Sequence, residues 1–507
     1  MSFPIKMLLA FALCAPALPG VAEETAPSAP ADSAGLPADV IRADFDALYA
    51  GLQASHYDLY ARRPRAQYEA LYRRMRADID GPLPATEVWR RFQAFVAYGN
   101  VAHARIDPPA TAWEAFRRAG GKAFPLFLRV VDGKVRVASD MTGMPGIALG
   151  DEVLSIDREP ALRWLRPARA LVSADNDYLA HAQLETQLPL LVWLSGDHAM
   201  SWAVVLRKPD GRRIAAVVPA QDRTGFEAAA KKRTNAFELD WNTREARVLD
   251  DGTAYLRPGP FYDNRPQATD PWDAGPFTAF IDEAFATFIE QRATRLLIDL
   301  RDNPGGDNSF SDRLIAWFAN RPFRFCKRFD IKVSQAAIAA NRKRVESANG
   351  GGDSISHKLA AAYAGREPGA HLDFPIPWVS PRDGRRYEGE VYVLVNRHSY
   401  SNSVLVAAMV QDFGFGTILG EETADLASTY GALETFTLAG TGLEVRFPKA
   451  RIERPSGDPS ARGVIPDVAI ATPLLPARDD VVLQRAAAVV ATHARGARSV
   501  PAAGAGQ

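Results

Sequence analysis

The sequence contains few of the residues that build disulfide frameworks and metal centres. Of its 507 residues only two are cysteine, Cys14 and Cys326, so we expect neither a disulfide framework nor a cysteine metal site. The eight histidines are scattered, without the His-x-x-x-His or His-Glu-x-x-His spacing of a zinc site. No Gly-Lys-Ser/Thr or Gly-x-Gly-x-x-Gly loop occurs either. We therefore expect no metal, no nucleotide and no other cofactor.

Neither sign of charge is in excess, and no long apolar run interrupts the body of the chain. Lysine plus arginine and aspartate plus glutamate both number 60, which gives a formal net charge of zero. A dedicated nucleic-acid or anionic-membrane surface would need a basic excess, so we expect no nucleic-acid partner. Beyond the N-terminus no stretch approaches the roughly 20 apolar residues of a spanning helix, so we expect no membrane span.

The N-terminus has the pattern of a secretory signal peptide. Lys6 is followed by an apolar stretch over residues 7–18, and small residues at 20–22 resemble a cleavage site. That apolar stretch is too short to cross a bilayer. We predict an exported protein, periplasmic or secreted, with a signal peptide over residues 1–22 and a Pro-, Ala- and Ser-rich linker over 23–36.

The next two regions differ in the period of their apolar residues. The first shows helical spacing, as in Phe45, Leu48, Tyr49 and Leu52. We therefore predict an N-terminal helical domain over residues 37–105. From Phe124 onward the apolar residues form short strand-like runs, joined by turns such as Asp132-Gly133 and Lys208-Pro-Asp-Gly211. We predict a compact β-rich module over residues 120–221.

The third region, residues 238–475, alternates strand and helix patterns, which implies a layered α/β core. We expect strands over residues 254–256, 296–300, 391–395 and 417–419, with helices over 276–290 and 309–319 and after Ser401. An insertion over about residues 330–386 includes a predicted helix at 331–348. The small, polar segment 495–507 is predicted to be a disordered tail.

One stretch of this core places a serine between a buried strand and a buried helix. The β-branched run over 391–395 leads through a short polar turn to Ser401, and an apolar helix follows. At the first turn of a helix, unpaired backbone N–H groups point outward and the helix dipole favours negative charge. Ser401 is therefore a candidate nucleophile for acyl transfer, whereas the alternative is that it only caps the helix.

A second stretch places two glycines directly after another buried strand. The string Asp299-Leu-Arg-Asp-Asn-Pro-Gly-Gly306 ends in Gly305 and Gly306, and glycine permits positive φ and a close approach of the backbone to a ligand. Such a turn suits N–H groups aimed at a carbonyl oxygen. An ordinary strand-to-helix turn is the alternative interpretation.

Together these motifs resemble the C-terminal processing, or tail-specific, serine peptidases, and more closely their tricorn-like branch. Ser401 within Ser399-Tyr-Ser-Asn-Ser403 matches the nucleophile turn, and Asp299 to Gly306 matches the family signature. Arg462-Gly-Val-Ile-Pro-Asp467 is similar to the closing motif, and Gly150-Asp-Glu-Val-Leu-Ser-Ile-Asp157 to the end of a PDZ domain. The resemblance implies an α+β multidomain protein with an N-terminal helical domain, a PDZ-like β module and a crotonase-like α/β catalytic core of ββα units.

The same resemblance suggests the catalytic base. The Ser–Lys branch has a lysine twenty-five residues after the nucleophile, where this chain has Leu426. The tricorn-like branch uses a histidine just after the helical domain, and His103 matches that place; a histidine suits a general base near neutrality. His398, three residues before Ser401, is the rival, with a turn residue as its alternative interpretation.

Two positions depart from the tricorn-like pattern. Ala102 stands where the branch has a second serine, and Ser460 where it has a glutamate. A carboxylate that orients the base would then come from elsewhere, and the candidates in the sequence are Asp458, Glu422 and Asp425. Histidine whose tautomer is not oriented is a poorer base, so this departure bears on activity more than on fold.

The resulting expectation is an exported serine-type endopeptidase that hydrolyses polypeptide substrates. Ser401 would attack the carbonyl, His103 would carry the proton, and the backbone of Gly305, Gly306 and Asn402 would form the oxyanion hole. The alternative is a catalytically inactive peptide- or ligand-binding protein on the same fold, since fold alone does not imply hydrolysis.

Overall fold

The computed structural model describes residues 35–232, 239–347, 355–474 and 479–497. The predicted signal peptide, all but the last two residues of the predicted linker, and residues 498–507 of the predicted tail lie outside the described residues. The chain divides into two compact units. The first unit comprises residues 1–237, 328–375 and 429–452, and the second comprises 238–327, 376–428 and 453–507.

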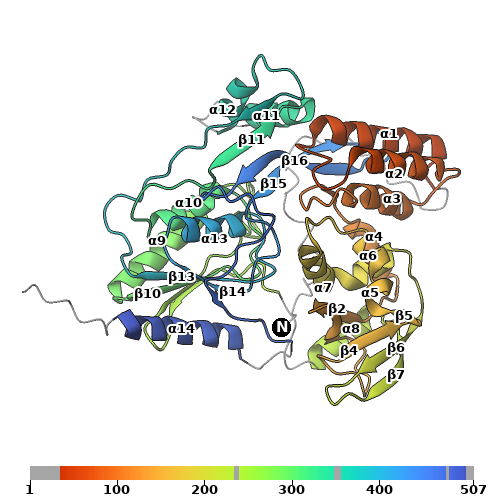
Figure 1. The fold of residues 1–507 in the computed structure, drawn as a ribbon, viewed down its shortest axis with the longest axis horizontal. Coiled ribbons are helices and arrows are strands. Elements are labelled where there is room, and N and C mark those ends of the chain that lie inside the picture. Colours follow the sequence, from red (N-terminus) through yellow and green to blue (C-terminus); the bar gives the residue numbers. More distant parts are fainter. Residues whose placement is uncertain (1–34, 233–238, 348–354, 475–478, 498–507) are drawn as a thin grey trace, which may run out of the picture. The chain divides into compact units, whose positions relative to one another are not determined.

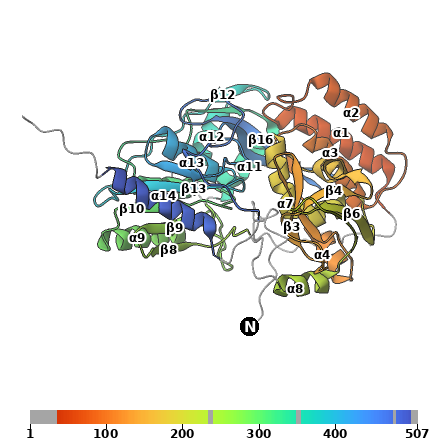
Figure 2. The same ribbon diagram turned by 60° about the horizontal axis from the view of Figure 1, so that its bottom comes forward.

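The first unit begins with helices whose aromatic side chains form a common core. Figures 1 and 2 show these helices packed side by side; they are α1 (Ala38–Ser55), α2 (Arg65–Ala77) and α3 (Ala85–Ala97). Phe45, Phe92 and Phe95 are fully buried, and ring contacts join Phe45 to both of the others. The helical spacing read from the sequence therefore corresponds to real buried faces.

An antiparallel sheet follows in the same unit, in the order β2-β3-β4-β6-β7 with β5 beside β4. Its strands are β2 (Leu126–Val131), β3 (Lys134–Asp140), β4 (Glu152–Ile156), β5 (Glu159–Pro160), β6 (Ser201–Arg207) and β7 (Arg213–Pro219). Both predicted hairpins are confirmed. Asp132 and Gly133 have φ of 51° and 71°, positive at both central residues as a tight two-residue hairpin turn requires. The accompanying helices are α4 (Ala110–Arg118), α5 (Ala161–Trp164), α6 (Arg166–Arg169), α7 (Asp177–Leu194) and α8 (Arg223–Lys232).

A second sheet of the first unit joins segments that are distant in the sequence. Its order is β1-β16-β11-β12, with β15 also paired to β16. The strands are β1 (Arg105–Ile106), β11 (Arg328–Lys332), β12 (His371–Asp373), β15 (Thr429–Thr437) and β16 (Glu444–Glu453), and the helices are α11 (Gln335–Ser347) and α12 (Ile355–Tyr363). The helix predicted from residue 331 was wrong at its start, because Ile331 pairs with Leu372 in β11 and β12. The Ser334 hydroxyl accepts from the Ala337 N–H and so caps the helix later.

The second unit is built on a mostly parallel sheet in the order β17-β14-β13-β10-β9-β8. Its strands are β8 (Glu245–Val248), β9 (Ala254–Arg257), β10 (Arg295–Asp299), β13 (Glu390–Val395), β14 (Thr417–Gly420) and β17 (Val468–Ala469). Only the edge strand β8 is antiparallel to its neighbour. The four strands predicted for this region are confirmed as β9, β10, β13 and β14.

Helices cover both faces of this sheet (Figure 1). On one face α14 (Val481–Ala497) packs Val482, Ala486 and Val490 against apolar residues of the strands. The other helices of the unit are α9 (Gly275–Glu290), α10 (Asn308–Ala316) and α13 (Asn402–Asp412). Strands covered on both sides read as continuous apolar runs, as residues 391–395 do. Because α14 extends to Ala497, the first residues of the predicted tail are helical.

Together the two units form a mixed α/β multidomain fold, as the sequence predicted. In the part of the chain that the structure describes, no helix combines the length and the apolar character needed to cross a bilayer.

Candidate functional site

Ser401 lies at the junction between strand β13 and helix α13, as predicted. The strand ends at Val395 and the helix begins at Asn402. Ser401 has φ 53° and ψ −122°, a backbone conformation that costs a non-glycine residue about 1–3 kcal/mol. Its side chain makes no capping hydrogen bond, so the interpretation of Ser401 as a simple helix cap gains no support. A strained backbone conformation of this kind persists only where the surrounding contacts enforce it, and such positions are often found at functional sites.

Several hydrogen bonds hold this strained turn against the end of strand β10. The Ser399 hydroxyl donates to the Leu300 carbonyl at 2.8 Å. The Tyr400 N–H and the Ser403 hydroxyl both donate to the carbonyl of Asn303, each at 2.9 Å. The serines flanking Ser401 therefore bind backbone, and among these three hydroxyls only that of Ser401 is not used for such a contact.

Gly305 and Gly306 form the neighbouring turn, and both need to be glycine. Gly305 has φ +87°, and a Cβ atom there would lie 2.6 Å from the Tyr400 carbonyl oxygen and 2.9 Å from Ser401 Cβ. Gly306 has φ +138°, and a Cβ atom there would lie 2.2 Å from the Phe261 carbonyl oxygen. The backbone of the glycine turn therefore lies directly against the Ser401 turn, and a side chain at either position would separate them.

Two backbone N–H groups of the adjoining Gly306 and Ser401 turns are candidate donors for an oxyanion hole. Among the described residues, neither the Gly306 N–H nor the Asn402 N–H donates a hydrogen bond within the protein. Asn402 is the first residue of α13, where the helix dipole adds positive potential. Its side-chain amide donates to the Ser311 hydroxyl of α10 at 2.9 Å, which ties α13 to the helix that follows the glycine turn. The Gly305 N–H, also predicted as an oxyanion donor, donates to Asn303 Oδ1 at 2.9 Å and is therefore already used within the protein. The Gly305 carbonyl accepts the Phe261 N–H at 2.9 Å, so Gly305 contributes the shape of the turn and its contact with the Ser401 turn.

The three candidate carboxylates lie in different surroundings. Asp425 is fully buried, and its Oδ2 accepts the backbone N–H of Ser401 at 2.7 Å. Asp458 is exposed and accepts from the N–H and hydroxyl of Ser460, each at 2.9 Å. Glu422 binds Arg462 at 2.7 Å near the surface. Of the three, the structure shows Asp425 in contact with the Ser401 turn.

The histidines occupy separate units. His103, in the first unit, lies between α3 and β1 and is 3% exposed. Burial, with a smaller contribution from the charge of Arg105, lowers the pKa of His103 to about 3, so its imidazole is neutral at neutral pH. His398, in the second unit with Ser401, is 7% exposed, and its backbone N–H donates to Asn396 Oδ1 at 3.0 Å.

Sequence reasoning missed the charged network beneath the glycine turn. Asp299, at the end of β10, is bound by Arg301 at 2.7 Å and by Arg257 at 3.3 Å. Burial alone would raise the pKa of Asp299, but the two guanidinium groups outweigh it and hold that pKa below its usual range. Arg301 also binds Asp480 at 2.6 Å, just before α14. The Asp-x-Arg spacing in the signature was the available signal for this network.

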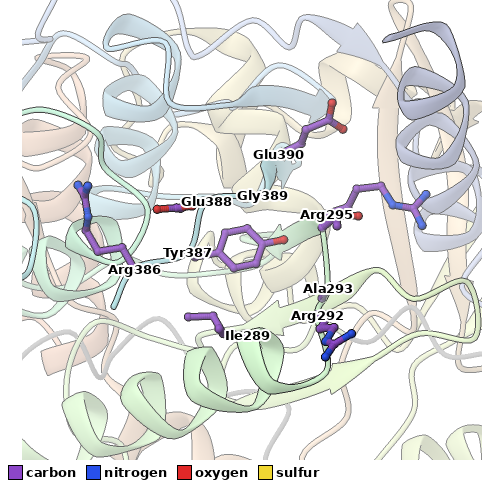
Figure 3. Close-up of a pocket in the computed structure, with 10 residues that line it drawn as sticks. Ile289, Arg292, Ala293, Arg295, Arg386, Tyr387, Glu388, Gly389 and Glu390 are labelled. Atoms are coloured by element: carbon purple, nitrogen blue, oxygen red, sulfur yellow. The ribbon is translucent and has the colours of Figure 1, made fainter. Parts of the chain in front are cut away.

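A separate open cleft of about 550 Å³ lies at the opposite ends of the central strands of the same sheet (Figure 3). It is lined at the starts of strands β10 and β13 by Arg295 and Glu390, whereas Ser401 follows the end of β13. Figure 3 shows the ring of Tyr387 in the middle of its lining. None of the predicted site residues lines this cleft.

Comparisons with known proteins identify the fold of the chain and the family of part of it. The chain matches the solved structure of mature CPAF at a TM-score of 0.56 and 14% identity, covering 89% of this chain and 96% of that one. A structure of mature CPAF complexed with lactacystin matches at a TM-score of 0.54 and 14% identity, covering 90% of this chain and 98% of that one. At this identity the likeness establishes a shared fold. A search of curated proteins gives no match.

Residues 271–470, which include Ser401 and the glycine turn, match the family described as peptidase family S41. The family resemblance predicted from the motifs is thereby confirmed, and the chain contains a peptidase family S41 domain.

Proposed function

We propose that this protein is a serine peptidase in which Ser401 is the nucleophile and polypeptides are the substrates. The observation that carries the proposal is the strained Ser401, held against the glycine turn with two N–H donors beside it. Membership of residues 271–470 in peptidase family S41 suggests serine protease activity, and a peptidase family implies polypeptide substrates. The specificity for C-termini stays a prediction.

In the proposed reaction, Ser401 Oγ forms a bond to the carbonyl carbon of the substrate while His103 takes the hydroxyl proton. The negative charge on the carbonyl oxygen is stabilised by the N–H groups of Gly306 and Asn402. The C–N bond then breaks, and the amine leaves with the proton from His103. Water attacks the acyl ester in the same way, which releases the carboxylate and restores Ser401.

The pairing of His103 with Ser401 rests on the family resemblance, because the two residues belong to different units. Burial keeps the His103 imidazole neutral at neutral pH, which a proton acceptor requires, although its pKa of about 3 lies well below the near-neutral value that best suits a general base. For the orienting carboxylate we propose no role for Asp458 or Glu422, since both bind surface partners. We propose instead that Asp425 fixes the backbone of the nucleophile itself.

Two finer features of the fold also stay predictions. The antiparallel sheet with α7 supports a PDZ-like module that would hold an extended chain. The parallel sheet covered by helices supports a crotonase-like core for the second unit. Neither assignment is needed for the chemistry proposed at Ser401.

Cleavage of an unfolded polypeptide tests the proposed function. The purified protein should cleave a dye-labelled unfolded protein near pH 8, and Ser401→Ala should abolish cleavage because the attacking oxygen is removed. Ser460→Ala is the matched control, since Ser460 is an exposed serine of the same unit, and it should retain activity. A chelator should leave the rate unchanged. Folded protein that cleaves no polypeptide would favour the alternative of a non-catalytic binding protein.

A further inference from the structure

A loop of the second unit, residues 262–274, carries an exposed tryptophan, Trp272, and the residue before the loop is hydrogen-bonded to the glycine turn. The loop begins after Phe261, which pairs with Gly306 as an isolated parallel bridge. The Phe261 N–H donates to the Gly305 carbonyl, and the Asp307 N–H donates to the Phe261 carbonyl, both at 2.9 Å. The start of the loop is therefore fixed to the backbone that would hold the oxyanion.

Hydrogen bonds bring the far end of the loop back to its start. The Asp263 N–H donates to the Pro271 carbonyl at 2.7 Å, and Trp272 follows directly. The Trp272 N–H in turn donates to Asp270 Oδ1 at 2.9 Å. Counting the chain steps and the two hydrogen-bonded steps, from Gly306 to Phe261 and from Asp263 to Pro271, Trp272 lies no more than about 20 Å from Gly306, a span of about six residues of extended chain.

The exposure of Trp272 is unusual for its residue type and for its place. Its side chain is 48% exposed, whereas tryptophan is highly buried on average and is enriched at binding surfaces. The second unit has two other exposed large apolar residues among those described, Trp378 and Ile465. Both lie near the far end of α13, where Trp378 meets Phe413 and the Ile465 carbonyl accepts from Gln411. Trp272 is the one attached to the glycine turn.

We infer that Trp272 forms a subsite for an apolar side chain of the polypeptide substrate, within about six residues of the bond to be cleaved. This inference rests on the proposed function and adds a substrate preference to it. The occupant is an aromatic or large aliphatic side chain, because the flat indole face offers apolar contact and no charge. Removing that contact should cost about tenfold to a hundredfold in selectivity for such a side chain.

A peptide scan tests the subsite. Internally quenched peptides of glycine, alanine and serine carry one phenylalanine, moved through six positions on each side of the cleaved bond. In the wild-type protein, phenylalanine at one or two positions should raise kcat/KM about tenfold to a hundredfold over the all-small peptide. Trp272→Ala should remove this preference, so that the ratio of kcat/KM for the phenylalanine peptide to that for the all-small peptide falls to about one. Trp272→Phe should restore most of it, and Trp378→Ala should leave it intact.

Two further measurements separate the subsite from the chemistry. The rate at which a small fluorophosphonate labels the protein should be unchanged by Trp272→Ala, which shows that the nucleophile turn is intact. Binding of the same peptides to Ser401→Ala protein, with and without Trp272→Ala, reports the subsite even if no cleavage occurs. Absence of cleavage and labelling in the wild type would overturn the proposed function. A phenylalanine preference unchanged by Trp272→Ala, or no preference in either rate or binding, would overturn the subsite.

Discussion

Replacing Gly305 with alanine should reduce the labelling of Ser401 by a fluorophosphonate about 100- to 1,000-fold, the loss expected when an oxyanion donor is displaced. The added Cβ would lie 2.6 Å from the Tyr400 carbonyl oxygen and 2.7 Å from the Asn402 nitrogen. Both contacts are with backbone, so the nucleophile turn itself must move. The positive φ of 87° adds strain for alanine.

The matched control for Gly305→Ala is Gly414→Ala. Gly414 also has positive φ, at +64°, and follows the end of α13, but an added Cβ meets nothing within 4 Å. Both variants should lose about 1–2 kcal/mol in the free energy of unfolding by denaturant through backbone strain, and Gly305→Ala should lose more because its Cβ also meets backbone atoms. Only Gly305→Ala should lose its labelling rate. Equal labelling rates in the two folded variants would show that the close approach of Gly305 does not serve the nucleophile.

Removing the carboxylate of Asp425 should also impair labelling, through the backbone of Ser401. Asp425→Ala leaves the Ser401 N–H without the acceptor that it has at 2.7 Å, and losing such a buried acceptor costs about 1–3 kcal/mol. Because that bond helps to hold Ser401 at φ 53°, its loss should let the turn relax. We expect a labelling rate at least about tenfold lower and a reduced free energy of unfolding. Asp425→Asn keeps an acceptor oxygen, so its labelling rate and its free energy of unfolding should lie between those of the wild type and those of Asp425→Ala.

Asp458→Ala and Glu422→Ala provide the comparison for Asp425. Both carboxylates bind exposed or half-buried partners, Ser460 and Arg462, so each change should alter stability by less than about 1 kcal/mol and leave labelling nearly unchanged. If either change slows labelling more than Asp425→Ala does, the carboxylate that supports the site has been assigned wrongly.

Local patterns were sufficient to predict the parts of the site that depend on neighbours in the sequence. The apolar run before Ser401 and the helix after it encode the strand–turn–helix, and two consecutive glycines encode the turn beside it. The role of Asp425 could not be found in this way, because its contact with the Ser401 N–H is made by tertiary folding. From the sequence, Asp425 was only one of three candidate carboxylates near the end of a strand.

The fold, too, could be predicted from the sequence only where it depends on local patterns. Strands β9, β10, β13 and β14 were predictable because strands covered on both faces are apolar throughout. The sheet that pairs Arg105 with Arg446 was not, since neither short segment carries information about a partner so far along the chain. The misplaced helix start at residue 331 has a related cause. Ile331 has the apolar character of a helix face, and only its pairing with Leu372 makes it a strand residue.

The most direct test of the account is to treat the protein with a fluorophosphonate and locate the adduct by mass spectrometry. The Ser401 oxygen should form a bond to phosphorus as fluoride leaves, with the proton taken by His103. Labelling should be abolished by Ser401→Ala and slowed about 100- to 10,000-fold by His103→Ala. Since the lowered pKa of His103 keeps the imidazole neutral, the rate should not fall with an ordinary histidine titration near pH 6.5. An unlabelled folded protein, or labelling that depends on His398 and not on His103, would contradict the account.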